Sequence, residues 1–336
     1  MSLPFLQYLA PAGLAEALEM KARRGGQAAW LAAGSDLLVR AKQGLIQPEA
    51  LISLKRLGPE LADVAEEPGQ WRLGAATTLA QAQEHPGLAR ELPGLAEALG
   101  RIGAPTLQQR VATLGGNLCA QTRCLYYNQS ALWRAGLAPC FKLGGQLCHP
   151  GGAGADRCRS TCQSDGAVML MALGASVVLQ NAAGQRTLDL RDFFTGRGEQ
   201  PQDLQPDELL TAILVPRQGA GRGSAYEKLA ARGAIDFPLL SAGAFIAVSG
   251  GVVSQARLAL GAVFAAPLLL KTALDPLLGQ APTPENLAAA AARAGNDAAP
   301  FFIENHSAPA AWRAQMVPVV VERTLTRAAH RALGGV

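Results

Sequence analysis

The sequence has no cysteine outside one short stretch: all six lie between positions 119 and 162. It has no Cys-x-x-Cys pair, which weakens a zinc-ribbon interpretation, and no Gly-x-Gly-x-x-Gly pattern, so a Rossmann fold has no support. No apolar run reaches the roughly 18 residues of a membrane span, and the start, Met1 to Phe5, lacks the features of a secretion signal. We therefore expect a cytoplasmic chain without a membrane anchor.

The excess of one sign of charge over the other is also small. The 30 basic and 26 acidic residues leave a formal net charge of only +4, without the basic blocks of a nucleic-acid surface. Nucleic acid is thus not an expected partner. The chain has 336 residues, 49% of them hydrophobic, enough for a sizeable core and for two or three packed units.

The order of helix and strand patterns predicts an α/β (α+β) fold with three units. Residues 1–56 read as a small α/β unit, in which a helix begins after Pro11, ends at Gly25, and is followed by strands at 28–33 and 50–54. Residues 57–217 read as a larger mixed sheet, interrupted by the cysteine-containing stretch at about 119–162. Thr77 or Thr78 is expected to cap a helix in this unit.

The third unit is predicted at residues 222–336, after a glycine-rich linker at 219–224. A hairpin is expected to pair 237–248 with 252–263 through the turn Ser249-Gly250-Gly251. Beyond it the chain is alanine-rich and helical, and Pro318 is expected to kink or divide the last helix.

Two glycine-containing turns are candidates for binding a phosphate. Glycine allows close backbone approach, and a turn at a helix start directs several N–H donors one way. Taken alone, each turn is more often only a turn. Their residues are Leu31, Ala32, Ala33, Gly34, Ser35, Asp36, Leu37 and Leu38 in the first, and Thr113, Leu114, Gly115, Gly116 and Asn117 in the second.

Together the turns resemble those of the flavoprotein subunits of the xanthine dehydrogenase and carbon monoxide dehydrogenase family. In that family an AGGT/S-D-L-L-like turn and a T-x-GGN turn cradle the FAD diphosphate between an N-terminal and a middle domain. The resemblance implies a carbon monoxide dehydrogenase flavoprotein-like (PCMH-type) fold with a C-terminal α+β domain. It implies FAD as cofactor and no conventional catalytic acid or base, because the redox chemistry belongs to the flavin.

The resemblance continues along nearly the whole chain. It implies that Asp165 contacts the ribityl or ribose hydroxyls, that Leu210 makes a backbone contact with the isoalloxazine, and that Lys228 lies near the flavin ring. From the residues alone, Asp165 would be a helix N-cap and Lys228 a solvated lysine at a strand end. The further matching segments are Gln109 to Ala112, Tyr226 to Lys228, Arg232, Asp236, Pro238, Leu260-Gly261, Trp312-Arg313 and Arg323.

The cysteine-containing stretch, residues 119–162, is named here the cysteine segment. Without a secretion signal, clustered thiols indicate a metal site more than disulfides. Thiolates select zinc or iron–sulfur clusters. His149 in place of one thiolate, structural zinc, and inert buried thiols are the alternatives.

The cysteine segment resembles a loop of the 4-hydroxybenzoyl-CoA reductase β subunit, inserted after the GGN turn, that binds a [4Fe-4S] cluster. The stretch Cys119 to Gln129, Trp133-Arg134, Cys140-x-Lys142 and Cys148 carries this likeness. It implies that Cys124, Cys140, Cys148 and Cys158 are the cluster ligands. Cys119 and Cys162 would then be spare thiols.

The resemblance also implies partners and a role. A molybdopterin-binding large subunit and a [2Fe-2S] small subunit would join this chain in a heterotrimer that often pairs into a dimer, and an external electron carrier such as ferredoxin or NAD would exchange electrons with it. An alternative is the flavin subunit of an aldehyde or N-heterocycle dehydrogenase. Two alternatives belong to other classes of protein: a non-enzymatic zinc-binding assembly protein and an independent FAD oxidase. An oxidase of that kind typically attaches flavin through a His or Cys in the first glycine turn, and Leu31 to Leu38 contains neither.

Overall fold

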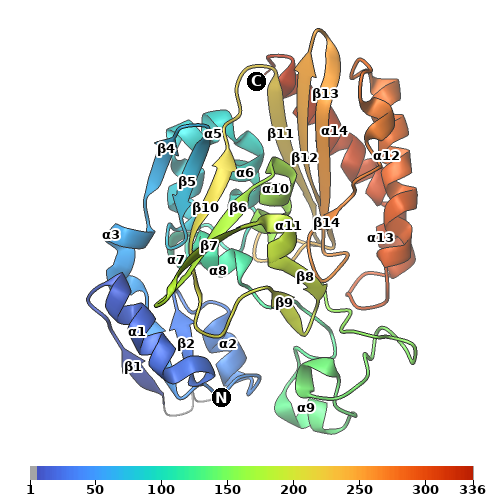
Figure 1. The fold of residues 1–336 in the computed structure, drawn as a ribbon. Coiled ribbons are helices and arrows are strands. Elements are labelled where there is room, and N and C mark those ends of the chain that lie inside the picture. Colours follow the sequence, from blue (N-terminus) through green and yellow to red (C-terminus); the bar gives the residue numbers. More distant parts are fainter. Residues whose placement is uncertain (1–5, 336) are drawn as a thin grey trace.

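The computed structural model describes residues 6–335, which form three larger sheets with helices packed on them and one small two-stranded sheet at 194–202 (Figure 1). The first sheet is parallel, with the order β1 (Gln7–Leu9), β3 (Ala50–Ser53), β2 (Ala28–Leu31). Helix α1 (Leu14–Arg24) packs against it with Leu14 and Leu18, which lie one turn apart on the same helix face, and with the adjacent Ala17. Helix α2 (Leu37–Lys42) follows β2 after a short turn.

The second sheet has five antiparallel strands. Their order is β4 (Val64–Glu67), β5 (Gln70–Gly74), β10 (Leu209–Pro216), β6 (Ser176–Asn181) and β7 (Gly184–Asp189). Helices α4 (Leu79–Glu84), α5 (Pro86–Glu91), α6 (Pro93–Gly100) and α8 (Leu114–Leu118) belong to the same part of the chain. Strand β10 is central although it comes last, so the sheet closes only after the cysteine segment has returned.

The third sheet has four antiparallel strands in chain order: β11 (Arg222–Leu229), β12 (Leu240–Ser249), β13 (Val252–Gly261) and β14 (Leu268–Leu269). Helices α12 (Pro284–Ala298), α13 (Ala310–Gln315) and α14 (Val317–Ala332) complete this part, with α14 packed on β11 and β12 (Figure 1). The remaining elements are α3 (Gly58–Leu61), α7 (Gln108–Val111), α9 (Ala131–Ala135), α11 (Leu190–Phe193), β8 (Phe194–Arg197) and β9 (Gln200–Gln202).

Helix α10 (Asp165–Leu173) joins the second and third sheets. All nine of its residues are buried, and it packs on β12 and β13 as well as on α6. Close approach is possible because β12 carries Gly243, where a Cβ would lie 3.1 Å from the Met169 Cα. The residue at the start of α10, Asp165, is thereby held in a rigid, dry position.

Most local predictions are confirmed. The first helix, the hairpin β12–β13 turning at Gly250-Gly251, the Thr78 cap of α4 and the division of the last helices next to Pro318 all occur. The linker predicted at 219–224 is wrong in its second half, because β11 begins at Arg222. Gly223 serves packing there: a Cβ would lie 2.1 Å from the Ala328 carbonyl oxygen of α14. The short strand β1 has no alternation long enough to have been predicted.

The strands of each sheet come from one of the three stretches 1–56, 57–217 and 222–336. In the described part of the chain, residues 6–335, no helix has the length and apolar character that crossing a membrane requires.

Candidate functional site

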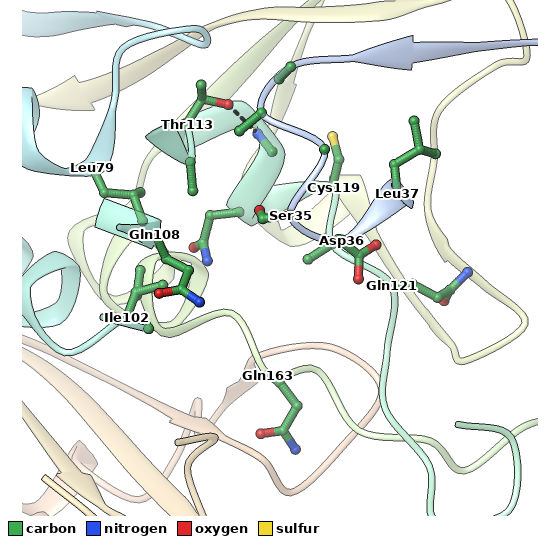
Figure 2. A pocket seen from close by; sticks show the side chains of 18 of the residues that line it. Ser35, Asp36, Leu37, Leu79, Ile102, Gln108, Thr113, Cys119, Gln121 and Gln163 are labelled. Carbon is green, nitrogen blue, oxygen red and sulfur yellow. Dashed lines mark hydrogen bonds between the residues drawn. The ribbon is translucent and has the colours of Figure 1, made fainter. Parts of the chain in front are cut away.

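A cavity of about 460 Å³ lies where the three sheets and the cysteine segment meet. Figure 2 shows side chains from these separate parts facing one space, among them Ser35, Thr113, Cys119 and Gln163. The walls are the first turn (Trp30 and 32–37, with Arg40), residues of α4 to α8 (Leu79, Ile102, Gly103, Gln108, Ala112, Thr113, Gly116, Asn117), both ends of the cysteine segment (119–121, Arg123, Gln163, Asp165) and a loop of the third unit (Arg232 and 235–237).

The first turn connects β2 to α2 and offers unpaired hydrogen-bond donors to the cavity. Gly34 has φ +79°, a conformation that other residues rarely adopt, and its carbonyl accepts the Leu38 amide at 3.0 Å. The amides of residues 33–36 have no acceptor among the described residues. Four consecutive free amides beside a cavity are an arrangement suited to an anionic ligand such as a diphosphate.

The second turn differs, because the amides of residues 114–117 are already bonded within the protein. Thr113 caps α8 by accepting the Gly116 amide at 3.1 Å, while the amides of Leu114 and Gly115 donate to the carbonyls of Thr77 and Ala75 at 3.0 and 2.8 Å. Residues 114–117 therefore offer the cavity the bare surface of Gly116 and the side chain of Asn117, rather than a run of free N–H donors.

Asp165 lies at the inner end of the cavity in a buried ion pair. Its carboxylate is 2.9 Å from the Lys228 ammonium and also accepts from the Tyr226 hydroxyl. Lys228 Nζ donates further to the carbonyls of Arg101 and Asp236, at 2.8 and 2.9 Å. Burial raises the pKa of Asp165, and the Lys228 charge opposes that rise.

The expectation that Asp165 caps its helix is wrong. Ser164 is the N-cap of α10: its hydroxyl accepts the Ala167 amide at 3.1 Å and donates to Asn117 Oδ1 at 2.6 Å. Asp165 is the first helical residue, and its carboxylate is free to bond elsewhere. The expectation of a solvated Lys228 is wrong too, since its side chain is only 4% exposed.

The structure brings most predicted flavin-site residues to the cavity, but not all. Those that do not line it are Leu31, Leu38, Leu114, Gly115, Leu210 and Lys228. Leu210 is buried in β10 opposite Leu179, and Lys228 reaches the site only through Asp165. The predicted contacts of these two residues with the flavin ring stay predictions.

Several lining residues were missed at the level of sequence. Arg40 could have been found, because it lies one helical turn after Asp36 on α2 and 3.6 Å from its carboxylate. Gln108, Gln163, Arg123 and Phe237 carry no local signal, since only the folded chain brings them to the cavity.

The cysteine segment forms a lobe around α9 that projects from the sheets (Figure 1). Three of the four predicted ligands, Cys124, Cys148 and Cys158, are buried, and Cys140 is partly exposed. The Cys148 sulfur accepts the Arg159 amide at 3.3 Å, and the Cys158 sulfur lies 3.1 Å from Ser160 Oγ.

Two of these thiols, Cys148 and Cys158, are neighbours that affect each other's pKa. Cys148 donates to Cys158, which lowers the pKa of Cys158 to about 6 and raises that of Cys148. Burial raises the pKa of Cys119 and Cys162 to about 12, which makes both unreactive. Among residues 6–335, no group of three or more His, Cys, Asp and Glu side chains is arranged to hold a metal ion. The four thiols thus share a lobe without forming a closed ligand set.

The comparisons with known proteins agree with the cavity. Residues 4–218 match the FAD binding domain in molybdopterin dehydrogenase, and residues 224–328 match the CO dehydrogenase flavoprotein C-terminal domain. The fold and the site define a flavin-binding oxidoreductase subunit, and the predicted fold class is confirmed. The chain belongs to the FAD-binding medium subunits of the molybdenum hydroxylase family.

Similar proteins span nearly the same length. The carbon monoxide dehydrogenase medium chain of Hydrogenophaga pseudoflava is 30% identical over 86% of this chain and 85% of its own. The aldehyde oxidoreductase FAD-binding subunit PaoB of Escherichia coli is 31% identical over 78% and 82%. A solved structure of carbon monoxide dehydrogenase from Hydrogenophaga pseudoflava superposes with a TM-score of 0.78 at 29% identity, covering 98% of this chain and 99% of that one.

Proposed function

We propose that this chain holds FAD in the cavity between its three sheets and passes electrons within a molybdopterin-containing oxidoreductase. The observation that carries this proposal is the run of four acceptor-free amides, residues 33–36, on the cavity wall. They would hold the diphosphate, with the Ser35 hydroxyl beside them. FAD, when bound, supplies the redox chemistry.

The other walls suit the remaining parts of the cofactor. Gly116 leaves room for close approach of the diphosphate, and the Asp165 carboxylate, fixed by Lys228, would accept from sugar hydroxyls. Ile102 and Phe237 offer apolar surface to a planar ring. No side chain in the cavity is required to act as an acid or base, so the protein's part is to bind, orient and exclude water.

Titrating FAD into purified apoprotein tests the cofactor assignment. We expect saturable binding of one FAD per chain, measured as quenching of the flavin fluorescence. A colourless protein that binds zinc and no flavin would instead support the non-enzymatic assembly protein.

The proposed partners are a molybdopterin-binding large subunit and a [2Fe-2S] small subunit. The relatives support multi-subunit assembly in their names, which include medium chain and medium subunit. Isolation of the native complex, followed by metal analysis, is expected to give molybdenum and iron together with FAD. The substrate would be set by the large subunit, so a reductase like the 4-hydroxybenzoyl-CoA enzyme and an aldehyde or N-heterocycle dehydrogenase both fit this chain.

We further propose that the cysteine segment binds a [4Fe-4S] cluster through Cys124, Cys140, Cys148 and Cys158. The concentration of all six thiols in one lobe and the adjacent pair Cys148 and Cys158 support this. The positions of the four thiols do not themselves support a cluster, because among residues 6–335 they do not converge on one point as metal ligands would. We therefore assign no electron-transfer step to the cluster.

Replacing Cys124 or Cys148 by alanine is expected to remove the bound iron and sulfide from protein prepared without oxygen. A thiolate ligand cannot be replaced by a methyl group. Cys119→Ala is the matched control, because Cys119 is a thiol of the same segment outside the proposed ligand set. Iron retained in both ligand variants would contradict the assignment, and bound zinc would favour the structural alternative.

The same lobe offers a surface for an external electron carrier. Residues 119–162 contain five Lys and Arg residues and one acidic residue, Asp156, so their formal charge equals that of the whole chain. Exposed apolar side chains lie among them, and Leu132 is 87% exposed. A segment of net positive charge with exposed apolar side chains suits a small acidic carrier protein such as a ferredoxin.

Leu132→Glu is expected to slow electron exchange between the assembled complex and ferredoxin by about tenfold, since it places on the docking surface a negative charge that repels the acidic carrier. The comparable exposed leucine at the far end of the chain, Leu333, provides the control variant Leu333→Glu. Equal rates for the two variants, or exchange only with NAD, would contradict docking on the lobe.

A further inference from the structure

The cysteine segment leaves the cavity after α8 and returns to it before α10. Its two ends are joined at Arg123 and Thr161, whose backbones exchange hydrogen bonds of 2.8 and 2.9 Å. Beside them the buried hydroxyls of Thr122 and Ser160 are 2.7 Å apart. Residues 122–123 and 160–161 thus form the neck of the cysteine segment, and their pairing fixes the position of Arg123.

The Arg123 guanidinium contacts the two other walls of the cavity. It forms an ion pair with Asp36 of the first turn, 87 residues earlier in the chain. It also lies 5.2 Å from the ring centroid of Phe237, in the loop of the third unit. Both Arg123 and Asp36 side chains are about one-fifth exposed, so solvent screens the pair only in part.

Asp36 needs such a partner if an anion binds here. Its carboxylate lies in the turn whose free amides face the cavity, and a carboxylate repels a diphosphate at short range. Arg40 lies 3.6 Å from the carboxylate, and Arg123 is closer. With both arginines in place, the group of three charges is positive overall.

We propose that Arg123 is a positioning residue that neutralises Asp36 and couples the cysteine segment to FAD binding. This rests on the proposed location of FAD in the cavity. The consequence is that the cysteine segment, whatever metal it holds, takes part in retaining the flavin, because its neck supplies the charge that lets the first turn accept a diphosphate.

FAD titration of the full-length apoprotein tests the proposal in four variants. Arg123→Ala is expected to weaken FAD affinity by about tenfold, the size of a partly screened ion pair. Adding Asp36→Asn to it is expected to recover most of that loss, because the uncompensated carboxylate is gone. Arg123→Lys keeps the charge and is expected to lose less. Arg157→Ala is the control: it removes the same charge from the same segment, where Arg157 bonds only its neighbour Asp156 among the described residues.

The double variant separates an electrostatic role from a structural one. A neck that merely stabilises the fold would lower the thermal stability of the apoprotein in Arg123→Ala, and Asp36→Asn would not restore FAD binding. Wild-type affinity in Arg123→Ala, or no recovery in the double variant, would overturn the proposal while leaving the flavin site intact. If Arg123→Ala does not fold, Arg123→Lys compared with Arg123→Gln gives the same contrast. A wild-type chain that binds no FAD would overturn both proposals.

Discussion

Replacement of Lys228 by methionine is expected to lower the free energy of unfolding by about 3 to 5 kcal/mol, the usual cost of breaking a buried ion pair by removing one partner. The two side chains are 4% and 3% exposed, so water cannot replace the lost ammonium at Asp165. The carbonyls of Arg101 and Asp236 would lose a donor as well. Urea unfolding of the apoprotein measures the change.

The loss should grow with pH. Burial raises the pKa of Asp165, so this carboxyl favours folding when protonated and ceases to do so as the pH rises through its folded pKa. In the wild type the Lys228 charge opposes this rise in the pKa of Asp165, and methionine cannot. We expect Lys228→Met to be less destabilising at about pH 5 than at about pH 8, relative to wild type.

Lys271→Met is the matched control, because Lys271 is exposed and has no side-chain hydrogen bond or ion pair among the described residues. It should change stability by no more than about 0.5 kcal/mol at either pH. An equal loss for the two lysine variants would show that Lys228 is not the partner that makes burial of Asp165 tolerable.

Gly34→Ala is expected to weaken FAD binding by roughly 10- to 100-fold, corresponding to about 1.4 to 2.8 kcal/mol. Its φ of +79° strains any residue with a Cβ, and that Cβ would lie 2.7 Å from Leu38 Cδ1. The turn would have to shift, and the free amides of residues 33–36 would no longer point together at one diphosphate.

Gly44→Ala separates strain from binding. Gly44 has φ +66°, lies in the same unit and is exposed, and a Cβ added there would meet no atom within 4 Å. We expect both variants to lose a similar amount of apoprotein stability, and only Gly34→Ala to lose FAD affinity. Unchanged FAD binding in Gly34→Ala would place the diphosphate elsewhere in the cavity.

Local features were predictable because local sequence determines them. The helix after Pro11, the hairpin at Gly250-Gly251 and the first turn at Gly34 each depend on residues within a few positions of one another. The wrong prediction of a linker at 219–224 arises instead from a contact with a distant part of the chain. Glycines there suggest a flexible linker, yet Gly223 is needed because α14, about a hundred residues later, packs against the strand.

The same division applies to the site. The two turns could be identified as candidates, but whether their amides are free depends on Thr77 and Ala75, which satisfy the second turn and not the first. The flavin contacts of Leu210 and the four thiol ligands stay predictions, since each depends on a group the chain holds only when assembled. The unit boundaries stay predictions as well.

By itself the sequence determined most of the helices and strands, the glycine turns and the gathering of all thiols in one segment, because backbone preference and residue spacing act over short distances. Only the tertiary structure decided that Arg123 meets Asp36 and that Lys228 meets Asp165, pairs 87 and 63 residues apart. The physical reason is that a side chain's charge environment is set by whichever chain segments pack around it, and that packing is fixed by the three sheets together.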